Sequence, residues 1–497
     1  MNGALKIIKD ESLTYHQKLL SLAQFAESTL DVLKIDDEIN DLRDKKIICD
    51  LYEGNAPYRP RYIIVDFEKF MKNGSKFLNL KPPTDIYEAT NNLLILYKNI
   101  PSITSFPVYL GNLDTLLEPF IVDEIEAYKA IKNFLLHIDR TLTDSFCHAN
   151  IGPHDSVAGY LILKATKELQ TAIPNLTMKV NSNTPKDFVL DGIDSALSTA
   201  KPSFANDEIF SNEFNNNYAI ASCYNGLPIS GGAYTLTRLN LANLSNQTNS
   251  EDEFFNTLLP NAVKLMCEYM DERIRFLVCE TPFFKESFLI KENLIDQNNF
   301  SAMFGLVGLA ECTNKLLNLV DSKKRYGKGQ KATDFALKVI EKIDELVKQH
   351  DNPYCTYSNN KFLLHAQVGI SDDIGITPGC RVPIKEDIEL FDQLLFEAKF
   401  HKYFPSGIGN IYPFDKKTKE NPSFVYDILN GSFKNQMRYF SLYSDDADVI
   451  RITGYLVKKS DIEKLKNDEQ VYSNSVVLGM DATQNHHILD RKVNKNG

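Results

Sequence analysis

Apolar residues recur along this chain with two different spacings, and these spacings predict helices and strands in alternation. A helical period combined with many charged positions favours amphipathic helices. We expect such helices at 13–33, 123–139, 157–171, 260–277 and 332–348. Short runs rich in β-branched and aromatic residues predict strands at 61–65, 102–110, 218–222, 234–241, 301–306 and 362–368. The Asn- and Ser-rich stretch 241–252 is expected to be a loop.

Strands that alternate with helices over most of a chain are typical of layered or barrel-shaped α/β proteins. With 497 residues, the chain can form one large domain or several smaller ones. Its 43% apolar and 24% charged residues are ordinary for a globular protein with a sizeable core. Composition therefore favours an α/β fold and leaves the number of domains open.

The net charge excludes some partners. At −11, it argues against nucleic acid or an anionic membrane surface as a main partner. No run of about 18 apolar residues occurs, so we expect no transmembrane helix. The first residues lack the apolar core of a signal peptide, and we therefore expect a cytoplasmic location.

The eight cysteines are widely spaced. The nearest two, Cys267 and Cys279, are twelve positions apart, so no CxxC pair occurs. A zinc or iron–sulfur site built on that spacing has no support, and we expect neither a bound metal nor a bound cofactor. A disulfide framework is also not expected in a large chain of this kind. Buried, reduced and inert thiols are the ordinary expectation for all eight.

A glycine near the C-terminus interrupts an apolar, β-branched run. Gly454 follows 449–453, where its missing side chain weakens a strand and commonly marks a bend. Glycine also has a rarer chemical use, because loss of a hydrogen from its Cα leaves a radical that the flanking amide and carbonyl groups stabilise. That radical requires a flat backbone, which a Cβ would obstruct. Both the bent strand and the radical site stay open on this feature alone.

A backbone radical needs a relay to reach a substrate, and a thiol suits this task because its S–H bond is close in strength to an activated C–H bond. Cys223 is the strongest candidate. It ends the strand-like run 218–222 and enters a turn that contains Gly226 and Pro228. Functional residues concentrate at such loop tips. The alternative is a buried structural cysteine at a strand end.

The stretch Arg451-Ile452-Thr453-Gly454-Tyr455 resembles the Arg-Val-x-Gly-Tyr loop of glycyl radical enzymes, with Ile452 in place of the valine. The segments 232–241 and 304–311 are similar to barrel segments of anaerobic ribonucleotide reductases, and they occur in the same order. Nearly the whole chain resembles the YjjI family of glycine radical enzymes. That resemblance includes 48–58, 102–111, 148–153 and 364–371.

This resemblance implies an α/β fold, a ten-stranded β/α barrel of two half-barrels with a central finger loop, surrounded by helices. It implies an N-terminal helical segment at 1–60, a catalytic barrel at 61–443 and a C-terminal glycyl radical segment at 444–497. A radical stored on Gly454 would pass to Cys223 as a thiyl, which would abstract hydrogen from a small polar substrate. The family gives no substrate.

Residues near Cys223 argue against some of the reactions that glycyl radical enzymes catalyse. Formate acetyltransferases carry two adjacent cysteines, whereas Ser222 stands here, so acyl transfer is disfavoured. Diol dehydratases carry a glutamate two residues after the thiyl cysteine, and Asn225 at that position cannot accept a proton. Ribonucleotide reductases carry paired CxxC motifs near the C-terminus that are missing here. Ribonucleotide reductase-like and lyase or dehydratase activities stay open as alternatives on the same scaffold.

Five polar residues are candidates for substrate binding. His148 and Asn150 are expected in a Gly-Pro turn, where ordinary turn hydrogen bonds are the alternative. His365 and Gln367 share one face of an expected strand. Glu311 is a candidate base. Arg59 and Arg61 could hold an anion, although surface charge is the commoner explanation.

The resemblance further implies a separate activating enzyme that uses S-adenosylmethionine radical chemistry, because this chain has no CxxxCxxC cluster. The 444–497 segment would then detach to expose Gly454. A homodimer stays open, since dimers are common in that superfamily. Two rival readings remain: a non-radical binding protein that retains the barrel, and an acid–base or metal enzyme that uses His148, His154 and Asp155.

Overall fold

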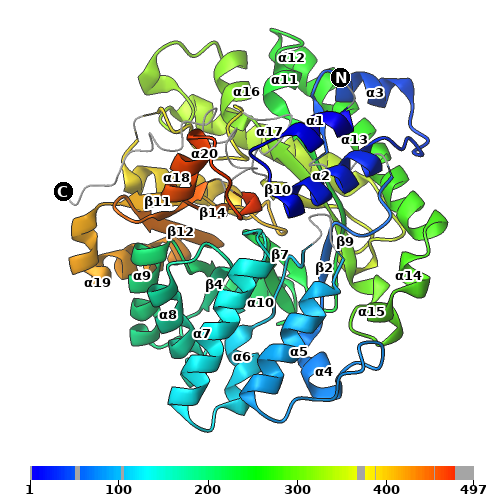
Figure 1. The fold of residues 1–497 in the computed structure, drawn as a ribbon. Coiled ribbons are helices and arrows are strands. Elements are labelled where there is room, and N and C mark those ends of the chain that lie inside the picture. The colour runs from blue at the N-terminus through cyan, green and yellow to red at the C-terminus, as the bar shows by residue number, and fades with distance from the viewer. Residues whose placement is uncertain are drawn as a thin grey trace.

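Two five-stranded sheets form the centre of the computed structural model, which describes residues 3–50, 56–101, 106–366, 375–386, 388–452 and 454–475. Helices surround the sheets (Figure 1). The first sheet consists of β1 (Ile48–Cys49), β2 (Tyr62–Ile64), β8 (Gly231–Asn240), β9 (Phe300–Val307) and β10 (Leu363–Ala366). The second consists of β3 (His148–Ile151), β4 (Asn175–Val180), β5 (Ser203–Asn206), β11 (Ile411–Phe414) and β12 (Tyr439–Ser444).

Each sheet combines parallel and antiparallel pairs. In the first sheet β8, β9 and β10 run parallel, while β1 and β2 both pair antiparallel with β8. In the second sheet β3, β4 and β5 run parallel, and β12 joins β5 antiparallel and β11 parallel. The parallel steps require helical crossovers, which supply the outer layer. The two sheets are the half-barrels of a ten-stranded β/α barrel, as predicted.

The outer layer contains helices of very different lengths. Among the described residues, the longer helices are α2 (Tyr15–Ser28), α5 (Ile86–Lys98), α7 (Glu124–Thr141), α8 (Val157–Leu169), α9 (Lys186–Thr199), α13 (Leu259–Arg275), α17 (Gln330–Gln349), α18 (Leu390–His401) and α19 (Pro422–Lys434). The shorter helices are α1 (Gly3–Lys9), α3 (Asp37–Asp44), α4 (Phe67–Asn73), α6 (Leu113–Leu117), α10 (Asp207–Glu213), α11 (Leu241–Ser245), α12 (Glu251–Glu253), α14 (Phe283–Glu286), α15 (Phe288–Lys291), α16 (Leu309–Leu316) and α20 (Lys459–Lys466).

Local sequence explains where these helices begin and which face they bury. The Asp123 carboxylate accepts the backbone N–H of Glu126 and so begins α7. α17 shows the helical period most clearly. Its residues Phe335, Val339 and Ile343 lie three or four positions apart and are all buried. The five helices predicted from periodicity therefore all form, with ends shifted by a few residues.

Two hairpins lie outside the sheets. The first joins β6 (Tyr218–Ala221) to β7 (Asn225–Pro228) and is buried along both strands. We call it the finger hairpin. The second joins β13 (Val449–Ile452) to β14 (Tyr455–Lys458). We call it the glycyl hairpin. Each hairpin carries at its tip one of the two residues that the sequence singled out for radical chemistry.

Some sequence predictions were wrong or incomplete. The described part of the expected strand 102–110, which begins at Phe106, is irregular. The expected loop 241–252 contains α11 and the start of α12. His148 and Asn150 lie in strand β3 rather than in a turn. The division into 1–60, 61–443 and 444–497 stays a prediction.

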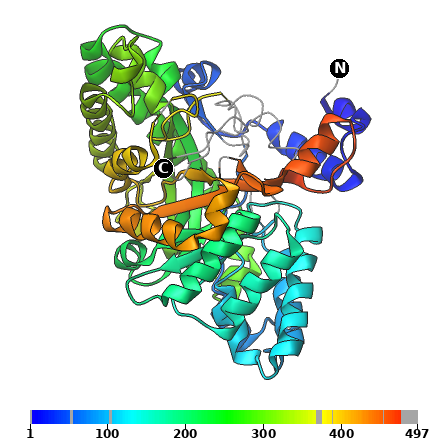
Figure 2. The ribbon, with the colours of Figure 1, turned by 90° about the vertical axis from the view of Figure 1, so that its left-hand side faces the viewer.

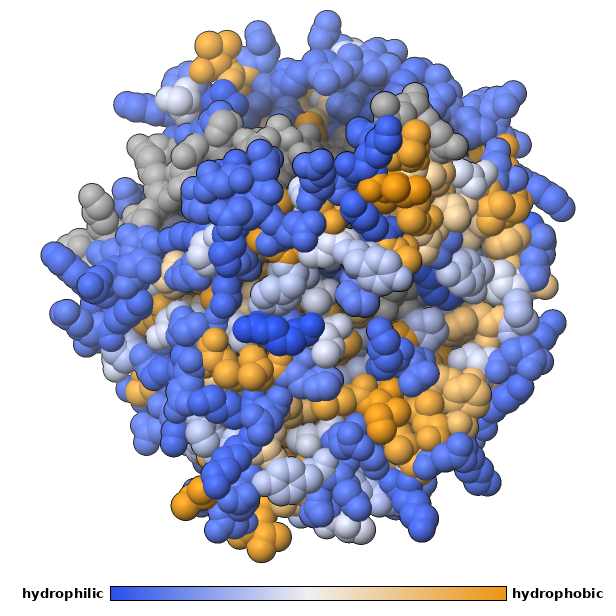
Figure 3. Space-filling view, in the orientation of Figure 1, coloured by the Kyte–Doolittle hydropathy of each residue, from blue (hydrophilic) through white to orange (hydrophobic). Residues whose placement is uncertain are grey.

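The two ends of the described chain lie close together. Figure 2 shows α20, in red, beside the N-terminal helices in blue. Gln17 of α2 donates a side-chain hydrogen bond to the carbonyl of Val471, 3.0 Å away. Polar residues cover much of the face seen in Figure 3. Across the described residues, no helix combines the length and the apolar composition that a membrane crossing requires.

Candidate active site

The finger hairpin places a thiol at its tip. Cys223 lies in the three-residue connection between Ala221 and Asn225, which face each other as the last pair of the hairpin. Ser222 takes a left-handed backbone conformation (φ 60°), and its N–H donates to the carbonyl of Val108, 2.9 Å away. The side chain of Cys223 is 4% exposed. The thiol is therefore held inside the molecule on a tight, anchored turn.

The tip of the glycyl hairpin meets this thiol. A Cβ built on Gly454 would lie 2.9 Å from the Cys223 sulfur and 2.6 Å from its Cβ. Both distances are shorter than van der Waals contact, so no side chain fits at residue 454 unless the tips separate. The Cα of Gly454 thus lies directly against Cys223. The close approach of the two hairpin tips therefore requires glycine at residue 454. From the sequence alone, a bend in the strand would have explained this glycine equally well.

Strand β4 holds the glycyl hairpin in place. The amide Nδ2 of Asn175 donates to the carbonyl of Gly454 over 3.3 Å. The Oδ1 of Asn175 accepts from the guanidinium of Arg451 over 3.1 Å, and Arg451 also donates to the carbonyl of Ala200 over 2.8 Å. Arg451 is 1% exposed. A buried, fork-shaped donor of this kind fixes orientation as well as distance.

A second chain of hydrogen bonds runs from the same face of β4 to the backbone of Cys223. The Tyr439 hydroxyl donates to the carbonyl of Cys223 over 2.8 Å, so its oxygen accepts from Thr177 over 3.1 Å. Thr177 in turn accepts from Nε2 of His148 over 2.7 Å. This direction assigns the proton of His148 to Nε2. All four residues are buried, and the chain fixes the backbone of the thiol turn.

Burial controls the protonation of this region. Desolvation raises the pKa of the Cys223 thiol to about 11, and the nearby charges of Arg381 and Arg451 offset only part of that rise. Cys223 is therefore an S–H group at neutral pH rather than a thiolate. Desolvation likewise lowers the pKa of His148 to about 3, so its imidazole is neutral. A thiolate nucleophile activated by a histidinium is not what this site presents.

An aromatic wall lies on the far side of the thiol turn. The hydroxyl of Tyr224 donates to the carbonyl of Ala366 over 2.8 Å, and its ring stacks on that of His365 with centroids 5.6 Å apart. The guanidinium of Arg381 lies 5.9 Å from the ring of Tyr224 and donates from Nε to the carbonyl of Gly409. Tyr224, the neighbour of Cys223 in the turn, thus lies beside a cation and a second ring.

The five candidate substrate residues take different places. Asn150 uses both amide atoms on Ile220 of the finger hairpin, each over 2.8 Å, and so anchors that strand. Glu311, at the start of α16, accepts from the N–H and the hydroxyl of Thr377. His148 and His365 both lie next to the thiol turn, as described above. Gln367 lies outside the described residues.

The rival site of His148, His154 and Asp155 is not assembled. His148 is fully buried, whereas His154 and Asp155 are exposed. In the described ranges, no three His, Cys, Asp or Glu side chains are grouped to hold a metal ion. Arg59 and Arg61 are buried rather than solvent-facing, contrary to the commoner explanation of their charge.

Sequence reasoning missed several residues that the fold brings to this site. They are Asn175, Thr177, Arg381 and Tyr439. Asn175 and Thr177 alternate with apolar residues on β4, so they share one face of that strand. That alternation was the available signal. We did not recognise this alternation because a polar residue in a sequence is normally expected to be exposed to solvent, even when its strand is buried.

Comparisons with solved structures define the class of protein. The chain matches the anaerobic ribonucleotide reductase of Thermotoga maritima with a TM-score of 0.66 at 12% identity, covering 94% of this chain and 88% of that one. It matches the B12-independent glycerol dehydratase of Clostridium butyricum with a TM-score of 0.69 at 11% identity, covering 96% and 88%. The fold is that of the glycyl radical enzymes.

Sequence comparison then gives the family. The family described as glycyl radical enzyme YjjI-like matches residues 13–494, and the chain belongs to it. An uncharacterized protein of Haemophilus influenzae is 43% identical over 99% of this chain and 97% of its own length. The uncharacterized protein YjjI of Escherichia coli is 39% identical over 98% and 95%.

Proposed function

We propose that this chain stores an unpaired electron on the Cα of Gly454 and passes it to the sulfur of Cys223. In that step the Cys223 S–H bond breaks and a C–H bond forms on Gly454, which leaves a thiyl radical. The thiyl then takes a hydrogen atom from a substrate carbon, so an S–H bond forms again and the radical moves to the substrate. Each step moves one hydrogen atom and one unpaired electron.

One observation carries this proposal: Gly454 lies against Cys223 with no room for a Cβ between them. Hydrogen transfer requires such contact, because near-attack geometry supplies much of the rate. The raised pKa of Cys223 supports it as well, since an S–H group can donate a hydrogen atom and a thiolate cannot. The anchors on both tips hold the two atoms together without further rearrangement.

The proposed substrate is small and polar. Cys223 is buried, so any reacting carbon must be enclosed with it, away from water. Polar groups of Asn225, His365 and Arg381 lie around the thiol turn. Whether the substrate radical loses a group, as in a lyase, or is reduced, as in an oxidoreductase, depends on the substrate itself.

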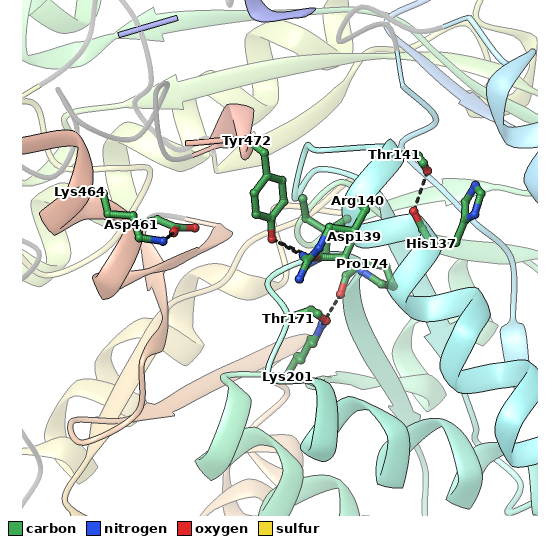
Figure 4. A network of polar contacts seen from close by, with 11 residues as sticks. His137, Asp139, Arg140, Thr141, Thr171, Pro174, Lys201, Asp461, Lys464 and Tyr472 are labelled. Atoms are coloured by element: carbon green, nitrogen blue, oxygen red, sulfur yellow. Dashed lines mark hydrogen bonds and ion pairs between the residues drawn. The ribbon is translucent and has the colours of Figure 1, made fainter. Parts of the chain in front are cut away.

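Activation is proposed to come from a separate radical S-adenosylmethionine enzyme that must reach Gly454. The chain after Gly454 is docked through buried apolar residues and also through polar contacts that can be exchanged for water. Figure 4 shows Tyr472, whose hydroxyl donates to Asp139 over 2.7 Å and accepts from Arg140 over 2.6 Å. Ser475 accepts from the N–H of Ser145 over 2.7 Å. We propose that these contacts release during activation.

Electron paramagnetic resonance of the anaerobically activated protein tests the relay. The remaining α-hydrogen of a glycyl radical splits its signal into a doublet. In D2O the thiol of Cys223 becomes S–D, and repeated transfer to and from Gly454 should replace that hydrogen and collapse the doublet to a singlet. Cys223→Ser should form the radical but keep the doublet.

Cys267→Ser is the matched control, because Cys267 is equally buried but belongs to α13. It should lose the doublet in D2O as the wild type does. The proposal fails if Cys223→Ser exchanges at the wild-type rate. It also fails if Gly454→Ala gives the same radical spectrum as the wild type after activation. The radical would then lie on a residue other than Gly454.

A further inference from the structure

The side-chain amide of Asn225 is buried, and its nitrogen donates no hydrogen bond among the described residues. Asn225 is the first residue of β7, two positions after Cys223, and is 1% exposed. Its Oδ1 lies 3.9 Å from the Cys223 sulfur. Its Nδ2 is fully buried and has no acceptor among the described residues. Buried polar atoms are nearly always paired, so this amide requires an explanation.

Two cations among the described residues act on the thiol turn. The charges of Arg381 and Arg451 both lower the pKa of Cys223. Arg451 is held by neutral oxygens of Ala200 and Asn175. Glu311, the candidate base, is instead bound to the backbone and hydroxyl of Thr377. The surroundings of Cys223 thus favour an anion or another strong acceptor.

We infer that Nδ2 of Asn225 donates a hydrogen bond to a carboxylate oxygen of the substrate and so orients the reacting carbon toward Cys223. This inference rests on the radical relay proposed above and adds the substrate class: a small organic acid. The amide can donate but cannot remove a proton. Asn225 therefore binds and orients the acid, while the hydrogen atom goes to the Cys223 sulfur.

Binding to the unactivated protein tests this assignment without any radical. Glycolate is the probe, and ethylene glycol is its neutral counterpart of similar size. Calorimetry should show that the wild type binds glycolate and that Asn225→Leu, which has a similar volume but no donor, binds it at least 10-fold more weakly. Asn225→Asp should also lose glycolate, because two carboxylates repel each other.

Thermal unfolding shows whether the leucine variant is folded and tests the unused amide separately. Removing a buried donor without a partner should leave the melting temperature of the ligand-free protein unchanged or raise it by about 1–2 °C. A large fall would mean that Nδ2 has a structural partner and would overturn the inference. Ala221→Val, at the facing position of the hairpin, controls for packing changes in the same turn.

Three binding results would also overturn the assignment. They are equal glycolate affinity in wild type and Asn225→Leu, tighter binding of ethylene glycol than of glycolate by the wild type, and no binding of either probe. The relay is scored independently by the collapse of the radical doublet in D2O in the wild type, which requires no bound acid. A failed collapse in the wild type would overturn the relay and with it the orienting role of Asn225, while the binding of the acid would stand. A failed binding difference would overturn only the acid assignment.

Discussion

At the scale of single residues, burial decides the chemistry of this protein. The same desolvation that keeps the proton on Cys223 removes it from His148, because both side chains lose the water that would stabilise their charged forms. His148 is neutral, and a chain of hydrogen bonds connects its Nε2 through Thr177 and Tyr439 to the backbone of Cys223. A residue first considered as a substrate ligand is thus tied into the support of the thiol.

The pKa of His148 predicts a pH dependence of stability. Because the folded pKa of about 3 lies below the ordinary value of 6.5, the folded state binds this proton less well than the unfolded chain. The resulting stability is fully present above pH 6.5 and is lost as the pH falls toward 3. The shift corresponds to roughly 5 kcal/mol. We expect the free energy of unfolding of His148→Asn, measured in denaturant, to fall less steeply over this range.

His137→Asn is the control for this prediction, because His137 is exposed on α7. It should follow the wild-type curve. His401 is also buried and has a pKa lowered to about 3 by desolvation, so part of the wild-type slope should remain in His148→Asn. Parallel curves for His148→Asn and the wild type would contradict the assignment of a neutral His148.

At the scale of elements, strand β4 connects the parts of the site. Its residues Asn175, Thr177 and Lys179 point to one face by strand alternation. They bond respectively to the carbonyl of Gly454, to the hydroxyl of Tyr439 and to the carbonyl of Tyr218 in the finger hairpin. One strand therefore sets the positions of both hairpins, and the register of β4 is what brings their tips together.

The docked segment after the glycyl hairpin gives a second prediction at this scale. Tyr472→Phe removes the hydroxyl that bridges Asp139 and Arg140 (Figure 4), which should weaken docking by about 1 kcal/mol. We expect amide exchange in residues 455–475 and the rate of activation to rise by roughly 5-fold. Hydrogen exchange with mass spectrometry and the rate of radical formation measure these two quantities.

Tyr87→Phe is the matched control for this variant, since Tyr87 donates to Glu126 on the surface in the same way but far along the chain. It should change neither quantity. Unaltered exchange in 455–475 of Tyr472→Phe would mean that other contacts hold the segment. The buried side chains Ile462 and Val471 would then be the anchors to test.

At the scale of the whole molecule, the two half-barrels enclose two hairpin tips that come from distant parts of the chain. The finger hairpin follows the second half-barrel's β5, and the glycyl hairpin follows its β12. Both tips are buried away from water, which would protect the radical that we propose. In the proposed mechanism, opening for activation would expose Gly454 to the solvent for as long as the segment stays undocked.

Exposure to air gives the prediction at this scale. Dioxygen should add to the Gly454 radical and cut the backbone there, dividing the 497-residue chain into a long N-terminal part and a short tail. Mass spectrometry should locate the cut at Gly454 only after activation. Gly454→Ala and unactivated wild type should stay intact. An intact chain after activation and air exposure would favour the rival reading of a non-radical barrel.

The sequence predicted the main helices because each buries one stripe, as the spacing of Phe335, Val339 and Ile343 in α17 illustrates. It did not predict β4, whose polar residues Asn175 and Thr177 are buried on the barrel's inner face. Local patterns assume that polar side chains meet water. In a barrel interior, polar side chains contact other parts of the chain instead of water. Hydropathy patterns therefore mispredict the strands that carry the buried polar residues of the site.

The amino-acid sequence by itself determined the α/β class of fold, because side-chain periodicity is local. Its resemblance to a known family, carried by residue types at fixed positions, singled out Cys223 and Gly454 as candidates for radical chemistry. Only the tertiary structure decided that Gly454 lies against Cys223, that His148 serves the thiol turn and that Asn225 has an unused donor. Such facts depend on contacts between residues distant in the chain and on desolvation, and both arise only when the barrel closes.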